Sequence, residues 1–129
     1  MTVEQLFTQT IGIMGLTPAN ATTYRDSLYA QINTILGQLF DLENNVRVFK
    51  GLEPLTEIPT ITSASDVLTY QDEILKRVVV WGLAQLFALT DDDTIKAGFF
   101  GARYSEESYN VMKLEQTDIV DVYGGSNEW

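Results

Sequence analysis

Acidic side chains are the groups in this sequence that could take part in chemistry. The 129 residues include 18 Asp and Glu but no His and no Cys, which excludes thiolate zinc sites and histidine-activated nucleophiles within this chain. Three acids stand together at Asp91, Asp92 and Asp93. They could bind a divalent cation, but adjacent acids at a helix start rarely converge on one ion, and they stabilise the positive end of the helix dipole. We interpret them as helix caps.

Carboxylate pairs could also act as general acid and base. With 18 acids, pairs arise by chance, and none is accompanied by a distinctive aromatic cleft pattern. The phosphate-binding patterns GxxxxGK[ST] and GxGxxG are both absent from the sequence. We therefore expect no catalytic residues, no cofactor and no metal, and a protein that is not an enzyme.

The formal net charge of −10 bears on the class of partner. A strongly acidic chain repels duplex DNA unless its basic residues cluster, and here they are scattered. An acidic surface along which DNA passes without binding is compatible with this charge. The basic residues are Arg25, Arg47, Lys50, Lys76, Arg77, Lys96, Arg103 and Lys113.

Nothing in the sequence predicts a secretion signal or a membrane span. The N-terminus lacks the basic start and apolar block of a signal peptide. The longest apolar block, Val78–Leu89, is shorter than the roughly 20 residues that a bilayer requires. We expect a soluble protein made in the cytoplasm, without membrane contact.

Helical periodicity organises most of the chain. Thr2 and Gln5 have the spacing of a capping box, and apolar residues on nearly all sides of Val78–Leu89 predict a central helix or one shared with a partner. In the last helix we expect the inward stripe Ile95, Phe99, Ala102, Tyr109 and Met112. The expected helices lie near residues 3–14, 20–45, 67–90 and 92–115. The expected core contains Leu28, Ile35, Leu39, Val78, Phe87 and Phe99.

Two segments do not follow this pattern. Leu52–Asp66 contains Pro54 and Pro59, which forbid a regular helix, and it is longer than a bundle turn requires. It is either a cover over the core or an arm that contacts a neighbouring subunit. The C-terminal segment is either a disordered end or a docking segment with a β-prone run and the terminal Trp129.

The predicted fold class is all-α: a small four-helix bundle with a long extended loop between helices 2 and 3 and an extended C-terminal tail. We expect one helical domain at residues 1–116 and the tail at residues 117–129. Candidate contacts with a subunit or another protein are Pro54, Ile58, Pro59, Ile61, Ile119, Val122, Tyr123 and Trp129.

Three segments carry a resemblance to a known family. They are FDLENNVRVFKGLEPLTEIPTIT at residues 40–62, VVVWGLAQLFALTDDD at residues 78–93, and the spaced aromatics Phe99, Phe100 and Tyr104. In these segments and in the order of its helices, the chain resembles the head–tail connector, or adaptor, proteins of tailed bacteriophages. Trp81 departs from the tyrosine–glycine pair that is frequent there.

The resemblance implies a subunit that forms a ring of about a dozen copies under the portal and extends the DNA channel towards the tail. Its implied partners are other copies of itself, the portal protein and tail-completion proteins. DNA would pass without sequence-specific binding, with Glu53 and Glu57 as candidate channel-facing acids. The implied location is the head–tail junction of a virion, after synthesis in a bacterial host or from a prophage. The alternative is an acidic DNA mimic or another protein-binding module.

Overall fold

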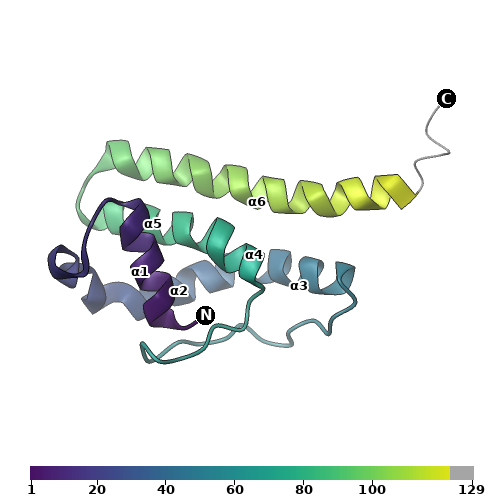
Figure 1. Cartoon of the computed structure of the whole chain (residues 1–129), viewed down its shortest axis with the longest axis horizontal. Helices are drawn as coiled ribbons and strands as arrows, with labels where there is room; N and C mark the ends of the chain where they lie inside the picture. The colour runs from purple at the N-terminus through teal and green to yellow at the C-terminus, as the bar shows by residue number, and fades with distance from the viewer. Residues whose placement is uncertain (123–129) are drawn as a thin grey trace.

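Helices pack around one central helix in the computed structural model, which describes the backbone of residues 1–122 and the side chains of residues 1–113. Figure 1 shows α6 lying along α5, with α2 and α3 beyond that central helix and α1 crossing it. The elements in chain order are α1 (Val3–Ile13), η1 (Pro18–Asn20), η2 (Thr22–Ser27), α2 (Leu28–Gln38), α3 (Phe40–Phe49), α4 (Asp72–Ile74), η3 (Leu75–Val79), α5 (Val80–Thr90) and α6 (Thr94–Val122).

The start of α1 follows the predicted capping box. The Thr2 hydroxyl accepts a hydrogen bond from the Gln5 amide at 3.2 Å, and the Gln5 side chain accepts one from the Thr2 amide at 2.9 Å. After the helix, Gly15 takes a φ of +76°, a conformation that costs glycine little. Local sequence therefore accounts for both ends of this helix.

The central helix runs through α4, the π-helical turn η3 and α5. Leu75, Val78, Val79 and Leu83 are all fully buried in it, because α1, α2 and α6 surround it. The Phe87 ring stacks on Tyr24 at 4.5 Å between centroids and meets Phe7 edge-on at 6.1 Å. Neighbours within the same chain thus cover most of this apolar helix.

Glycines let α5 and α6 approach closely. A Cβ at Gly82 would lie 2.8 Å from the Tyr104 ring, and one at Gly101 would lie 2.5 Å from the Gln85 side chain. A larger residue at Gly82 would require the Tyr104 ring or the Ile35 side chain to move. The flexible end of Gln85, by contrast, could shift away from a side chain at position 101. The contact at Gly82 therefore constrains the packing more strongly than the contact at Gly101.

The all-α class is confirmed, but several details of the predicted bundle are wrong. The expected helix at 20–45 is divided into a 3₁₀ turn, α2 and α3, with a break at Leu39 two residues after Gly37, which disfavours a helix interior. The expected helix at 67–90 begins only at Asp72. The long loop follows α3 rather than one continuous second helix.

The C-terminal prediction is also wrong in part. Helix α6 continues to Val122, so residues 117–122, expected as the start of an extended tail, are helical. A regular helix satisfies its own backbone hydrogen bonds, so a short run of β-prone residues at its end need not interrupt it. Residues 123–129 lie outside the described part of the chain.

Candidate functional site

The acidic corner between α5 and α6 is structural. Asp93 precedes α6, and its side chain accepts a hydrogen bond from the Lys96 amide at 3.1 Å. Asp91 accepts a hydrogen bond from the Tyr24 hydroxyl, and burial together with this bond raises the pKa of Tyr24 to about 12. Asp92 has a φ of +55° in the turn. Each acid therefore has its own role in the turn, and only Asp93 caps α6 as predicted.

A shallow hollow of about 440 Å³ lies between α1 and α4. The charged groups in it are already paired, because Asp72 contacts Lys76 at 3.7 Å and Glu4 binds Arg25 at 2.6 Å. In the described residues no group of three or more His, Cys, Asp or Glu could hold a metal ion. None of the helices searched there is long and apolar enough to cross a bilayer.

The long segment between α3 and α4, residues 52–71, is called the strap below. Two asparagine side chains each form a pair of hydrogen bonds with the strap backbone, as the backbone of a neighbouring β-strand would. Asn44 accepts from the Leu55 amide at 2.7 Å and donates to the Leu55 carbonyl at 3.0 Å. Asn33 does the same for Ile61, at 2.8 and 3.1 Å. The strap is therefore fastened to α3 and α2 at two points.

A buried ion pair fastens the two ends of the strap. Glu43 is fully buried; it accepts from Arg47 at 2.6 Å and from the Gln71 amide at 2.8 Å. Arg47 also donates to the carbonyls of Thr69 at 2.7 Å and Glu53 at 3.2 Å. Burial raises the pKa of Glu43, and the two hydrogen bonds to its carboxylate oppose that rise. We call this network the Glu43 clasp.

The strap also pairs with the N-terminus. The Val3 and Glu4 amides donate to the carbonyls of Asp66 and Ala64, and the Leu68 amide donates to the Met1 carbonyl. These bonds, with the asparagine contacts and the clasp, favour the interpretation of the strap as a cover over the core.

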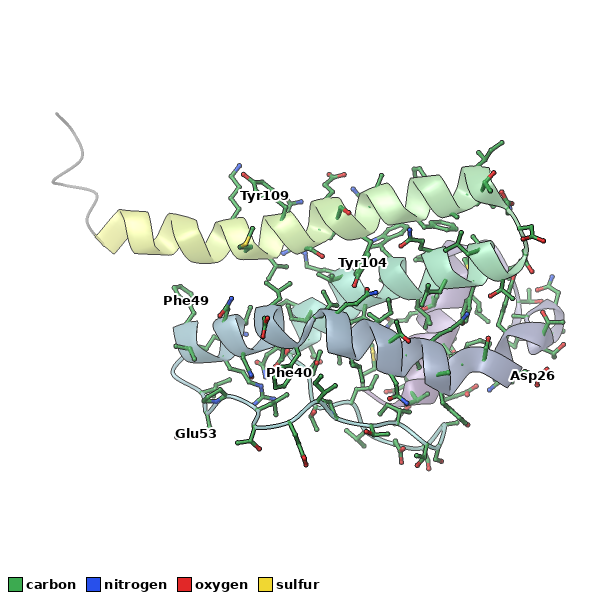
Figure 2. All side chains as sticks on the ribbon, turned by 180° about the vertical axis from the view of Figure 1, so that it is seen from behind. Asp26, Phe40, Phe49, Glu53, Tyr104 and Tyr109 are labelled. Carbon is green, nitrogen blue, oxygen red and sulfur yellow. The ribbon has the colours of Figure 1, made fainter. Side chains whose placement is uncertain are left out.

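The predicted contact residues of the strap fall into two groups. Ile61 is 4% exposed and packs in the core of its own chain, where it is not available to a neighbour. Ile58 is 47% exposed, and Pro54 and the two candidate channel acids Glu53 and Glu57 are exposed as well, while Pro59 is half-buried. Figure 2 labels Glu53 beside the end of α3.

The predicted contacts near the C-terminus are placed less fully. Ile119 and Val122 belong to the last turns of α6, where the structure describes the backbone. Tyr123 and Trp129 lie outside the described residues. The proposed docking role of this segment stays a prediction.

The predicted inward stripe of α6 is wrong. Ile95, Phe99, Ala102, Tyr109 and Met112 are all exposed, and we call these five residues the outer face of α6. The residues that pack inward are Ala97, Phe100, Tyr104 and Val111.

Apolar residues lie along both the inner and the outer side of α6. Helical periodicity alone therefore did not identify the side that packs against the body. Figure 2 shows Tyr104 on the side of α6 towards the other helices and Tyr109 on the side away from them. The Tyr104 hydroxyl donates to Gln38 at 2.8 Å. Glycine alone does not mark the inner side, because Gly98 of the same helix has open space beside it while Gly101 lies against Gln85.

A second exposed apolar group lies at the end of α3 and the start of the strap. Val48 is 63% exposed, Phe49 44% and Leu52 43%. We call these three residues the α3 end face. Sequence reasoning did not single out Val48, Phe49 or Leu52, because they continue the apolar pattern of the preceding helix.

Comparisons with family models, curated proteins and solved structures found no match for this chain.

Proposed function

We propose that this chain is a structural subunit of the head–tail connector of a tailed bacteriophage, assembling as a ring beneath the portal. The sequence resemblance of residues 40–62 and 78–93 motivates the proposal. The first of these segments spans α3 and the start of the strap, and the second spans most of the central helix and the acidic corner. Phe100 and Tyr104 pack against that helix.

The observation that carries the proposal is the presence of two separate apolar surfaces on a small chain. The outer face of α6 and the α3 end face belong to different elements, and both expose large apolar side chains. A ring subunit meets one neighbour through one surface and the next neighbour through another, so it needs two such surfaces. Exposed apolar patches commonly mark protein contacts.

The charge of the chain suits a DNA channel. With a net charge of −10, the assembled ring would present acidic walls along which phosphates slide rather than bind. Glu53 and Glu57, exposed on the strap, are our candidates for channel-facing acids. The proposed partners are the portal protein and tail-completion proteins, and the proposed location is the head–tail junction.

Deletion of the gene in the phage or prophage that encodes this chain tests the function. We expect DNA-filled heads and free tails to accumulate without joining, and complementation to restore complete particles. Electron microscopy of the neck of the complete particle should then show density for the chain. Normal joining without the gene, or absence of the chain from purified particles, would refute the proposal.

A point variant tests the α3 end face. Phe49→Asp should reduce head–tail joining while the circular dichroism spectrum stays helical, because the side chain is exposed and its loss leaves the core intact. Asn45→Asp, an exposed change on the same helix, is the matched control. Equal effects of the two variants would remove this face from the assembly contact.

A further inference from the structure

A regular seam runs along the side of α6 that faces away from the body. Its positions follow one another in steps of four, three, four, three and four, the alternation that characterises a coiled-coil seam. All six positions are exposed. In order they are Ile95, Phe99, Ala102, Glu106, Tyr109 and Lys113.

No helix within residues 1–122, the part of the chain that the structure describes, covers this seam. Ile95 is 86% exposed, Phe99 60% and Tyr109 56%, although the opposite side of the same helix is well packed. A coiled-coil seam is stable only when another helix covers it. Because the body lies on the inner side of α6, a partner helix has free access to the outer side (Figure 1).

The two charged residues of the seam can form ion pairs between two copies of α6 when the copies run antiparallel. Glu106 lies three residues before Tyr109, and Lys113 lies four residues after it. Glu106 also contacts Arg103 of its own chain at 3.2 Å, in a pair whose side chains are 35% (Arg103) and 56% (Glu106) exposed. When two copies of α6 meet antiparallel with the two-fold axis between positions 109 and 110, each Glu106 comes level with Lys113 of the other copy. Parallel pairing would instead place Glu106 on Glu106 and Lys113 on Lys113. Polar residues within a seam are known to set register and orientation in this way.

The position of Tyr109 permits a long overlap. It stands close to the middle of the 29-residue α6, so antiparallel pairing there overlaps nearly the whole helix, about 40 Å at 1.5 Å per residue. Because the body packs on the inner side of α6, the two bodies of such a pair would lie on opposite sides of it.

We propose that the free protein forms a two-fold dimer in which the seams of two α6 helices pair antiparallel about an axis between positions 109 and 110, with reciprocal Glu106–Lys113 ion pairs. Such a contact is isologous and closes at two copies, unlike the contacts of a ring. The inference stands independently of the proposed connector function. Where both hold, the pair must separate before the outer face of α6 can take part in ring contacts.

Charge exchange on the full chain tests the pairing. We expect sedimentation to give twice the chain mass of 14.5 kDa at micromolar concentration. Glu106→Lys or Lys113→Glu alone places like charges together twice in each dimer, and should raise the dissociation constant by about tenfold or more. The double variant Glu106→Lys with Lys113→Glu should restore dimerisation.

The matched control is Glu57→Lys, the same charge change at an exposed position on the strap. It should leave the dissociation constant nearly unchanged. If the double variant is as weak as the single variants, or if the control weakens association equally, the reciprocal pairing is refuted. A monomer at every concentration refutes it as well, as does a larger species unaffected by the exchanges.

Cross-linking gives a second readout, because the chain contains no other cysteine. Tyr109→Cys should form a disulfide-linked dimer under mild oxidation, since the two copies of this position lie next to the two-fold axis. Gln9→Cys, exposed on α1, should cross-link far less. Equal yields from the two variants would contradict the proposed geometry.

Discussion

The strap side of the molecule buries polar groups, whereas the outer face of α6 exposes apolar ones. Under the strap, the carboxylate of Glu43 and the amides of Asn33 and Asn44 have their partners within the chain. On α6, Phe99 and Tyr109 are more than half exposed. Buried polar groups that have hydrogen-bond partners within the chain need none from another protein. Covering an exposed apolar group with a partner, by contrast, lowers the free energy. The polar groups beneath the strap therefore have their partners within the chain, whereas Phe99 and Tyr109 on α6 are left largely exposed by it.

The largest effect should come from breaking the Glu43 clasp. Arg47→Ala leaves a fully buried carboxylate without its charged partner, and we expect the free energy of unfolding to fall by about 3–5 kcal/mol. Urea denaturation measures the loss. Lys50→Ala is the control, because the Lys50–Glu73 pair at 2.5 Å is more than one-third exposed on each side and should contribute about 0–1 kcal/mol. Equal losses would show that the clasp does not hold the strap side together.

Adjacent phenylalanines allow a direct test of the two sides of α6. Phe100 is 5% exposed and Phe99 is 60% exposed. Phe100→Ala should lower the free energy of unfolding by about 3–5 kcal/mol through lost burial and a cavity. Phe99→Ala should change it by only about 0.5 kcal/mol when measured at a concentration where the protein is monomeric. The reverse order would restore the inward stripe expected from the sequence.

A smaller and more local effect is expected along the strap. Asn44→Ala should speed hydrogen exchange at the Leu55 amide and leave Ile61 protected, while Asn33→Ala should do the opposite. Each loss of a paired side-chain contact should cost about 1–3 kcal/mol. Rapid exchange at both amides in the unchanged monomer would show instead that the strap is a mobile arm.

The smallest effect is expected with DNA. Duplex DNA should bind the free protein no more tightly than about 10⁻⁴ M at physiological salt, and Glu57→Gln should hardly change this value. Fluorescence anisotropy with a labelled duplex would measure it. Micromolar affinity with a steep salt dependence would indicate DNA recognition and contradict the idea of a passive channel wall.

Local patterns in the sequence predict much of the helical framework. The capping box of Thr2 and Gln5, the cap at Asp93 and the apolar Val78–Leu89 block all act within a few residues of chain, so the element types follow from nearby positions. The prolines in the strap likewise exclude a helix there. The break at Leu39 and the late start of α4 were not predicted, because local preferences for a helix do not fix its ends.

Only the tertiary structure decided which residues have their packing and hydrogen-bond partners within the chain. From the sequence we predicted that the stripe from Ile95 to Met112 faces inward, but the opposite side, with Phe100 and Tyr104, packs against the body. The sequence also left the strap open as a cover or an arm, and partners 11 and 28 residues away, at Asn44 and Asn33, fastened it. The physical reason is the same in both cases: burial and hydrogen bonding depend on groups that are distant in sequence, so no local pattern contains them.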